Sequence, residues 1–325
     1  MSKPGFDLAL RPATLDDAAI VADLETARNP DDPRDPVMLR FWWSTRSPDD
    51  KAHELISERD GAAIAFVGAG HEPWKDKPKR FGWVRASLHP EVWTALRFEQ
   101  AVGLAEDWLR DVGGAIAVVR RYGNQTDEIG VLERRGYKEV RRQKHQHLDL
   151  VEHREALLAA AEQSRVQMRE QGVALLTLDH DDDPERMTKL YELTMATWHD
   201  IPTTVPIHLP PYEEWLRIFF DNPSVRKDRF WIARVDDAIV GLSFISHPPI
   251  RGLPWTNYTA TSKGVRGRGI ARAMKYESLA QAIALGHQRV GTSNDGENAP
   301  ILHLNAELGY RPAVPEIELH RELGP

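Results

Sequence analysis

The sequence contains no cysteine among its 325 residues. This absence excludes disulfide bonds, metal sites built from thiolates and a cysteine nucleophile. Long apolar runs are also missing, and the longest, near residues 62–67, is far too short to cross a membrane. The first residues form no apolar signal segment. We therefore expect a cytoplasmic protein without a membrane partner.

An excess of positive charge is absent as well. Asp and Glu number 49 against 42 Lys and Arg, which gives a formal net charge of −7. This balance argues against general nucleic-acid binding and favours cationic or small polar partners. A hydrophobic content of 41% and a charged content of 28% are typical of a globular protein. The length is sufficient for two ordinary domains.

A segment rich in arginine and glycine, residues 259–275, is the most informative part of the sequence. Gly267 and Gly269 allow the backbone to approach an anion in conformations that side chains hinder. Arg266 and Arg268 supply charge-assisted hydrogen bonds to phosphate. An amphipathic helical pattern follows directly, and the N–H groups at a helix N-terminus attract anions. We predict a pyrophosphate-binding turn, for which the alternative is a strand-to-helix loop with solvated arginines.

A second motif follows after one predicted helix, which ends before Gly286, and one predicted strand. It consists of Asn298 with Gly309 and Tyr310 at fixed spacings. The first motif, Arg266-x-x-Gly269-x-Ala271, resembles the acyl-CoA signature of the GCN5-related N-acetyltransferases, the GNAT superfamily. The second motif resembles the block that follows in those proteins.

The order of predicted elements repeats along the chain. Residues 1–150 and residues 173–325 each begin with a strand and helices and later contain a short helix followed by a Gly-Tyr pair; strand-like sequence follows this pair in the first copy. The sequence therefore resembles a tandem GNAT protein of the α/β class, α+β in type. Each copy is expected to have a mixed, mostly antiparallel sheet with a splayed parallel strand pair and helices on both faces. A linker helix is expected at residues 151–172.

The two predicted copies differ in chemistry. Residues 87–99, where the first copy should have its phosphate-binding turn, contain no glycine and two glutamates. Gln125 stands where the second copy has Asn298. We interpret the first copy as degenerate, with a structural role or as a wall of the substrate cleft.

The resemblance implies acetyl-CoA as the acyl donor, with no metal ion. The pantetheine arm would pair with the strand before the turn, at the point where two parallel strands diverge, and the pyrophosphate would lie on the turn. Asn298 would hydrogen-bond the arm. The residues implied in donor binding are Thr259, Ala260, Thr261, Arg266, Gly267, Arg268, Gly269, Ile270, Ala271 and Asn298.

The resemblance also implies a small-molecule amine as the acceptor, which attacks the thioester within a ternary complex, so that positioning supplies most of the acceleration. Asn305 occupies the position where the superfamily usually has a thiolate-protonating Tyr; it can hydrogen-bond the sulfur but cannot protonate it. Tyr258 either replaces that donor or packs in the core. His199 either accepts the proton of the amine or interacts with the end of its helix. Either Trp255 or Asn257 faces the acceptor.

Three functions therefore stay open from the sequence. The first is an acetyl-CoA-dependent N-acetyltransferase whose second copy is active. The second is a non-catalytic acyl-CoA-binding or scaffold protein, which Asn305 in place of Tyr favours. The third is another phosphate-binding module, disfavoured because the sequence has no Gly-x-x-x-x-Gly-Lys-Ser/Thr loop. Two fused copies either imitate a dimer within a monomer or leave the second copy to form a homodimer.

Overall fold

The computed structural model describes residues 6–75, 77, 79–200, 209–296 and 298–324. The elements of the first half are β1 (Arg11–Pro12), α1 (Ala18–Arg28), α2 (Pro36–Ser44), β2 (Lys51–Arg59), β3 (Ala62–His71), β4 (Phe81–Leu88), α3 (Ala95–Asp111), β5 (Ile116–Tyr122), α4 (Thr126–Arg134) and β6 (Lys138–Asp149). Those of the second half are α5 (Arg154–Glu170), β7 (Ala174–Thr177), α6 (Arg186–Trp198), α7 (Tyr212–Phe220), β8 (Phe230–Val235), β9 (Ala238–Ser246), β10 (Trp255–Thr261), α8 (Ile270–Ala284), β11 (Arg289–Asp295), α9 (Ala299–Glu307), β12 (Arg311–Pro312) and β13 (Glu316–Glu322).

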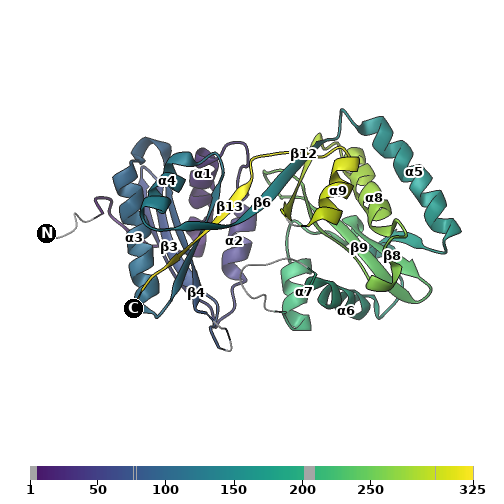
Figure 1. The fold of residues 1–325 in the computed structure, drawn as a ribbon, viewed down its shortest axis with the longest axis horizontal. Coiled ribbons are helices and arrows are strands. Elements are labelled where there is room, and N and C mark those ends of the chain that lie inside the picture. The colour runs from purple at the N-terminus through teal and green to yellow at the C-terminus, as the bar shows by residue number, and fades with distance from the viewer. Residues whose placement is uncertain (1–5, 76, 78, 201–208, 297, 325) are drawn as a thin grey trace.

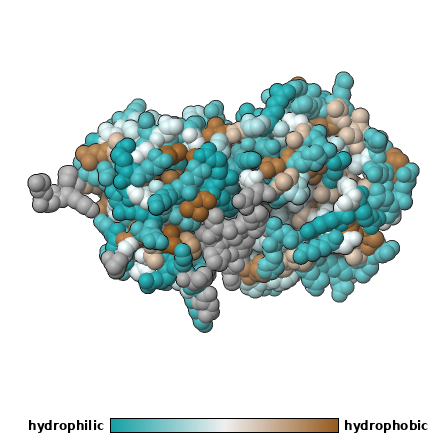
Figure 2. All heavy atoms as spheres, viewed as in Figure 1, coloured by the Kyte–Doolittle hydropathy of each residue, from teal (hydrophilic) through white to brown (hydrophobic). Residues whose placement is uncertain are grey.

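Both halves contribute to one long mixed sheet (Figure 1). The strand order is β1-β2-β3-β4-β5-β13-β6-β11-β10-β9-β8-β7, and β12 pairs with β6 beside this path. The predicted α/β fold with a mixed sheet is therefore confirmed. Figure 2 shows hydrophilic side chains over most of the face in view, with apolar ones scattered among them. No helix among the described residues has the length and apolar character needed to span a membrane.

Helices cover both faces of the sheet. Alternate residues of β9 point to opposite faces, because side chains alternate along a strand. Phe244 packs in a core with Trp215 of α7 and residues of α6, whereas Ile245 packs in a core with Leu279 of α8 and residues of α5. In the first half, α1 and α2 pack against the core around Phe66, and α3 and α4 pack on a separate core.

Several element boundaries follow directly from local sequence. Thr14 and Asp17 form the predicted capping box before α1. Gly172, with φ +69°, follows the end of α5 as predicted. Asp183-Pro184 has the pattern of an N-cap followed by proline and predicts a helix that begins at Pro184, but α6 begins two residues later, at Arg186. The Asp183 carboxylate accepts a hydrogen bond from the Glu185 backbone N–H at 2.8 Å and from the side chains of Lys189 and Arg234 at 2.8 and 2.6 Å.

The sequence prediction missed β2 and the last two strands, and β13 changes the organisation of the sheet. Its residues pair with β5 on one side and β6 on the other, so the C-terminal strand lies within the first half (Figure 1). In turn β6 extends into the second half, where residues 143–149 pair with β11. The two halves thus exchange strands. The predicted domain boundaries at residues 150 and 173 stay a prediction. By sequence β13 belongs to the second half, but it pairs with strands of the first half.

Each half contains one parallel strand pair that opens, as predicted. In the first half β4 and β5 pair only as far as Trp83 and Val118. In the second half β10 and β11 pair only at their first residues, and Thr256 and Thr292 form the last pair. A bulge in β10 follows immediately, between Thr256 and Tyr258. The strands diverge toward their carboxyl ends, where open α/β sheets bind ligands.

Candidate active site

The arginine- and glycine-rich turn has the backbone geometry that its sequence predicts. Gly267 and Gly269 have φ angles of +80° and +83°, in the left-handed region that favours glycine. Gly269 is the N-cap residue of α8. The first hydrogen bond of the helix runs from the Ala273 N–H to the Gly269 carbonyl, at 3.0 Å. The N–H groups of residues 270–272 therefore have no acceptor within the helix and point toward the turn.

The side chains of the turn have different surroundings. Arg266 is partly exposed and forms a 2.5 Å ion pair with Asp200, which follows α6. This guanidinium lowers the pKa of the Asp200 carboxyl. Arg268 instead donates to the backbone carbonyl of Gln171 after α5, at 2.9 Å. Ile270 is buried in the core, so only its backbone faces the turn. Of the two arginines, Arg266 is therefore the one whose side chain stays at the turn.

The strand before the turn has one open edge. Between Tyr258 and Thr261, β10 pairs with β9 on one side. Beyond Thr256, no strand in the described part of the chain pairs with the other side. The Thr259 hydroxyl lies 2.9 Å from that of Ser243 on β9. The backbone of this segment therefore has groups free to pair with an extended ligand.

The two asparagines of the second motif have different environments. Asn298 is the N-cap residue of α9 and is partly buried. Asn305 is completely buried, and its Nδ2 donates to Gln146 Oε1 at 2.9 Å and to Asn294 Oδ1 at 2.8 Å. Its Oδ1 is buried without a hydrogen-bond partner in the described structure. Asn305 therefore anchors α9 to β11 and to β6, which comes from the first half.

The two other predicted catalytic residues lie near the end of α6. The Tyr258 hydroxyl is 2.9 Å from the Thr197 hydroxyl, and burial raises the pKa of Tyr258. His199 is exposed at the C-terminal end of the helix. Their catalytic roles stay predictions. Tyr258 lines the cavity beside the bulge of β10, and His199 does not.

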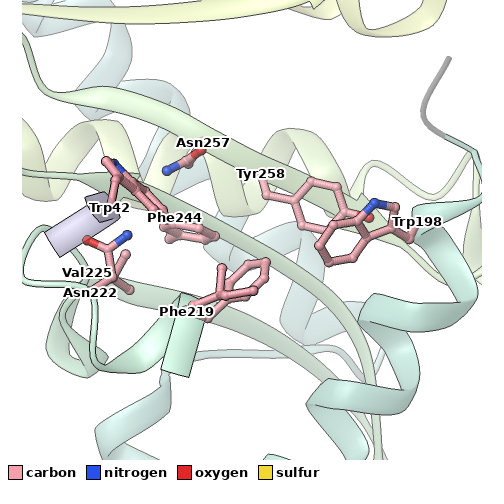
Figure 3. Close-up of a pocket in the computed structure, with 9 residues that line it drawn as sticks. Trp42, Trp198, Phe219, Asn222, Val225, Phe244, Asn257 and Tyr258 are labelled. Atoms are coloured by element: carbon pink, nitrogen blue, oxygen red, sulfur yellow. The ribbon is translucent and has the colours of Figure 1, made fainter. Parts of the chain in front are cut away.

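A cavity of about 210 Å³ lies beside the bulge of β10. Figure 3 shows Trp198 beside Tyr258 toward one end and Trp42 toward the other. Most of its surface is apolar, and none of the described residues that line it is charged. The lining residues are Trp42, Trp198, Ile218, Phe219, Asn222, Val225, Phe244, Asn257 and Tyr258.

The cavity is lined by one of the two residues that the sequence offered for contact with the acceptor and by residues that it did not indicate. Asn257, rather than Trp255, lines the cavity. Trp42 belongs to α2 of the first half, so both halves contribute to the site. The apolar periodicity of α2 and α7 marks Trp42 and Phe219 as core candidates, and only the fold places them at a cavity.

The opening between β4 and β5 in the first half is filled by charged side chains. Arg121 of β5 donates to the carbonyl of Ala86 on β4, at 2.8 Å. Arg28 donates to both oxygens of Glu128, at 2.7 and 2.8 Å, and to Glu25 at 2.9 Å. The Arg28 and Arg121 side chains are only 7% and 6% exposed. An extended ligand would have to break this network to enter.

Solved structures share this architecture over their full length. A tandem GNAT protein from the clavulanic acid biosynthesis pathway matches with a TM-score of 0.73 at 15% identity, covering 98% of this chain and 99% of that chain. A GCN5-related N-acetyltransferase from Sphaerobacter thermophilus matches with a TM-score of 0.66 at 19% identity, covering 98% and 96%. FemX matches with a TM-score of 0.57 at 10% identity, covering 96% and 97%.

At the level of sequence, no family model matches the chain. No curated protein matches it either. The structural matches, at identities below 20%, establish a common fold. The chain therefore has the tandem GNAT fold that its two motifs and its repeated order of elements predict.

Proposed function

We propose that this protein is an acetyl-CoA-dependent N-acetyltransferase that acts on a small-molecule amine through the second half of the chain. One observation carries the proposal: three features lie along residues 256–261 of β10 and at its carboxyl end. These are the open edge of β10, the glycine turn at the start of α8, and the aromatic cavity on the α6–α7 face. Donor and acceptor would approach this point from different directions.

The residues present fit acetyl-CoA as the donor. The N–H groups at the start of α8 and the exposed part of Arg266 suit a pyrophosphate. The left-handed glycines leave the backbone accessible, since a Cβ at Gly267 would meet no atom within 4 Å. The unpaired edge of β10 suits the amide groups of a pantetheine arm. Acetyl-CoA would supply the thioester, and the backbone of β10 would orient it.

The cavity fits an amine with an apolar or aromatic body. Aromatic rings attract a protonated amine through their faces, and Asn222 and Asn257 add hydrogen-bonding groups. In the reaction the amine loses a proton, its nitrogen attacks the thioester carbonyl, and the C–S bond breaks. Holding the two reactants together would supply much of the rate acceleration.

The first half would act as a wall of the acceptor site. Trp42 contributes to the cavity from α2. The buried network of Arg28, Arg121 and Glu128 occupies the opening where a second acyl donor would enter. We therefore propose one acyl-CoA site per chain.

The alternative function is a non-catalytic acyl-CoA-binding protein. The observation that favours it concerns Asn305, which stands where the superfamily usually has its thiolate-protonating Tyr. Its Nδ2 donates to Gln146 and to Asn294, so its amide hydrogens are not available to the sulfur of CoA. Release of free CoA when an amine is supplied would distinguish the enzyme from the binding protein.

Calorimetric titration with acetyl-CoA tests the proposal. The wild-type protein should bind one equivalent, and Gly269→Glu should abolish binding, because it adds a side chain and a negative charge at the turn. Gly61→Glu is a matched control: Gly61 also has a positive φ, at +76°, and open space around it, but lies in the β2–β3 turn. Two equivalents would refute the single site, and no binding would refute the proposed function.

A screen of amines with apolar and with charged bodies, read by CoA release, would follow. Turnover with apolar amines supports the enzyme and the assigned cavity. Acetyl-CoA binding without turnover of any amine would favour the non-catalytic alternative.

A further inference from the structure

Lys275 on α8 is a buried lysine without a charged partner. It is 2% exposed, and its Nζ lies 5.2 Å from the centre of the Tyr310 ring. Within the described part of the chain, no group forms a hydrogen bond or ion pair with Nζ. Buried ammonium groups normally have such partners, because an unsatisfied one is costly. A bound ligand that accepts a hydrogen bond from Nζ would therefore stabilise the Lys275 ammonium.

The surroundings place Lys275 next to the point where β10 and β11 diverge. The Tyr310 hydroxyl is 3.1 Å from the hydroxyl of Thr256. Thr256 and Thr292 form the last pair of the two strands, and the Thr292 hydroxyl donates to the Thr256 carbonyl at 3.3 Å. One turn before Lys275, Arg272 forms an ion pair with Glu307 of α9. Lys275 thus lies beside the strand opening and near the side of α8 that faces α9.

The charge on Lys275 is poorly stabilised where it lies. Burial alone lowers the pKa of Lys275 to about 7. The titratable side chain that faces it is Tyr310, whose pKa is raised by burial. Arg272 is already paired with Glu307, and the nearby residues of β10 and β11, Thr256 and Thr292, carry no charge. A group in this setting exchanges a proton near neutral pH.

We infer that Lys275 is the catalytic residue that donates a proton to the leaving thiolate of CoA. This inference rests on the proposed function. When the amine nitrogen attacks the thioester carbonyl, the C–S bond breaks and its electron pair passes to sulfur. The Lys275 ammonium transfers one Nζ proton to that sulfur and becomes a neutral amine. The proton released by the acceptor amine restores the ammonium, directly or through water, so that the products are CoA thiol and an amide.

The other candidate donors are less suitable. Asn305 cannot release a proton at neutral pH. The Tyr258 hydroxyl is hydrogen-bonded to that of Thr197 in α6, and it lies on the face of the sheet opposite to α8. Tyr310 lies close to Lys275, but its raised pKa opposes proton release to a thiolate. Lys275 alone among these four combines proximity to the opening with a proton available at neutral pH.

The test compares Lys275→Met with the wild-type protein and with Tyr310→Phe. Met keeps the approximate length of the side chain and removes the proton, whereas Phe keeps the ring and removes the hydroxyl. The first measurement is the ratio of dissociation constants for CoA and desulfo-CoA, which differ at the sulfur. The second is the ultraviolet thiolate absorption of bound CoA at pH 7 to 9.

We expect the wild-type protein and Tyr310→Phe to prefer CoA over desulfo-CoA by about tenfold or more, the worth of a charge-assisted hydrogen bond. Lys275→Met should lose this preference and the thiolate band. With an amine that the wild-type protein acetylates, its rate of CoA release should fall by about a hundredfold, the lower range for a general acid.

The possible failures are distinguishable. If Lys275→Met keeps the preference and the thiolate band, the inference is overturned while the proposed function stands. If Tyr310→Phe loses them and Lys275→Met does not, the tyrosine is the donor. If the wild-type protein binds neither acetyl-CoA nor CoA, both the proposed function and the inference fail.

Discussion

Replacement of Lys275 by Met should stabilise the protein, and more so at low pH than at high pH. Burial lowers the pKa of Lys275 from 10.5 to about 7. This difference corresponds to about 5 kcal/mol against folding while the side chain is protonated in both states. Met is apolar and of similar length, and replacing a buried charge by a packed apolar side chain is often stabilising.

The sign of the pH dependence follows from proton binding. Between pH 7 and 10.5 the unfolded chain holds a proton on Lys275 that the folded protein has released. The free energy of unfolding of the wild-type protein therefore rises with pH in this window, through this group, by about 1.4 kcal/mol per pH unit. Below pH 7 both states are protonated and the penalty is constant. The advantage of Lys275→Met should accordingly be largest below pH 7 and shrink toward pH 9.5.

Urea denaturation of both proteins at pH 6, 7, 8 and 9 measures this difference, and the other titrating groups cancel between them. Lys189→Met is a matched control. Lys189 forms ion pairs with Asp183 and Asp237, which raise its pKa. Its contribution is present at every pH below 10.5, so the difference between this variant and the wild-type protein should not change from pH 6 to 9. A constant difference for Lys275→Met as well would refute the assigned burial of an unpaired charge.

Three further predictions concern the donor site, the acceptor site and the first half. Arg266→Ala should weaken acetyl-CoA binding by about tenfold or more, because a charge-assisted contact to phosphate is lost. Arg97→Ala, at the start of α3 in the segment of the first half that corresponds to the turn, should leave binding unchanged, and equal effects in titration would contradict the assigned turn. Trp42→Ala should raise the KM for the amine and leave the dissociation constant of acetyl-CoA unaltered, and a change in the latter alone would remove Trp42 from the acceptor site. Glu128→Gln removes the carboxylate that pairs with both buried arginines, Arg28 and Arg121, so it should lower the free energy of unfolding by about 3 kcal/mol without affecting acetyl-CoA binding; reduced binding would implicate the first half in donor recognition.

The exchange of strands makes the two halves of the chain depend on each other. Because β13 completes the first half and β6 extends into the second, neither half has a full set of strands of its own. Asn305 illustrates the consequence, since its amide is held by Gln146 from β6. The candidate active site therefore depends on the first half for support as well as for the wall at Trp42.

The parts of the fold that could be predicted from sequence depend on neighbouring residues. The capping box at Thr14, the left-handed Gly267 and Gly269, and the tight turn at Asp236, which joins the antiparallel strands β8 and β9, are all determined by conformations that the local residues favour or allow. Apolar periodicity indicated most of the helices and strands, because this pattern depends on residues only a few positions apart. The turn that we propose for donor binding belongs to this class, so its backbone geometry could be predicted from the sequence alone.

The remainder was decided by contacts between distant segments. Nothing in the periodicity of β13 indicates that it lies between β5 and β6, because pairing partners in a sheet depend on the whole topology. The sequence places Arg268 beside Arg266, yet the fold directs it to Gln171. Lys275 has the sequence character of an exposed helical lysine. It is buried without an ion-pair partner among the described residues only because α8 packs between the sheet and neighbouring helices. Burial and charge environment are properties of three-dimensional packing, which local sequence does not specify.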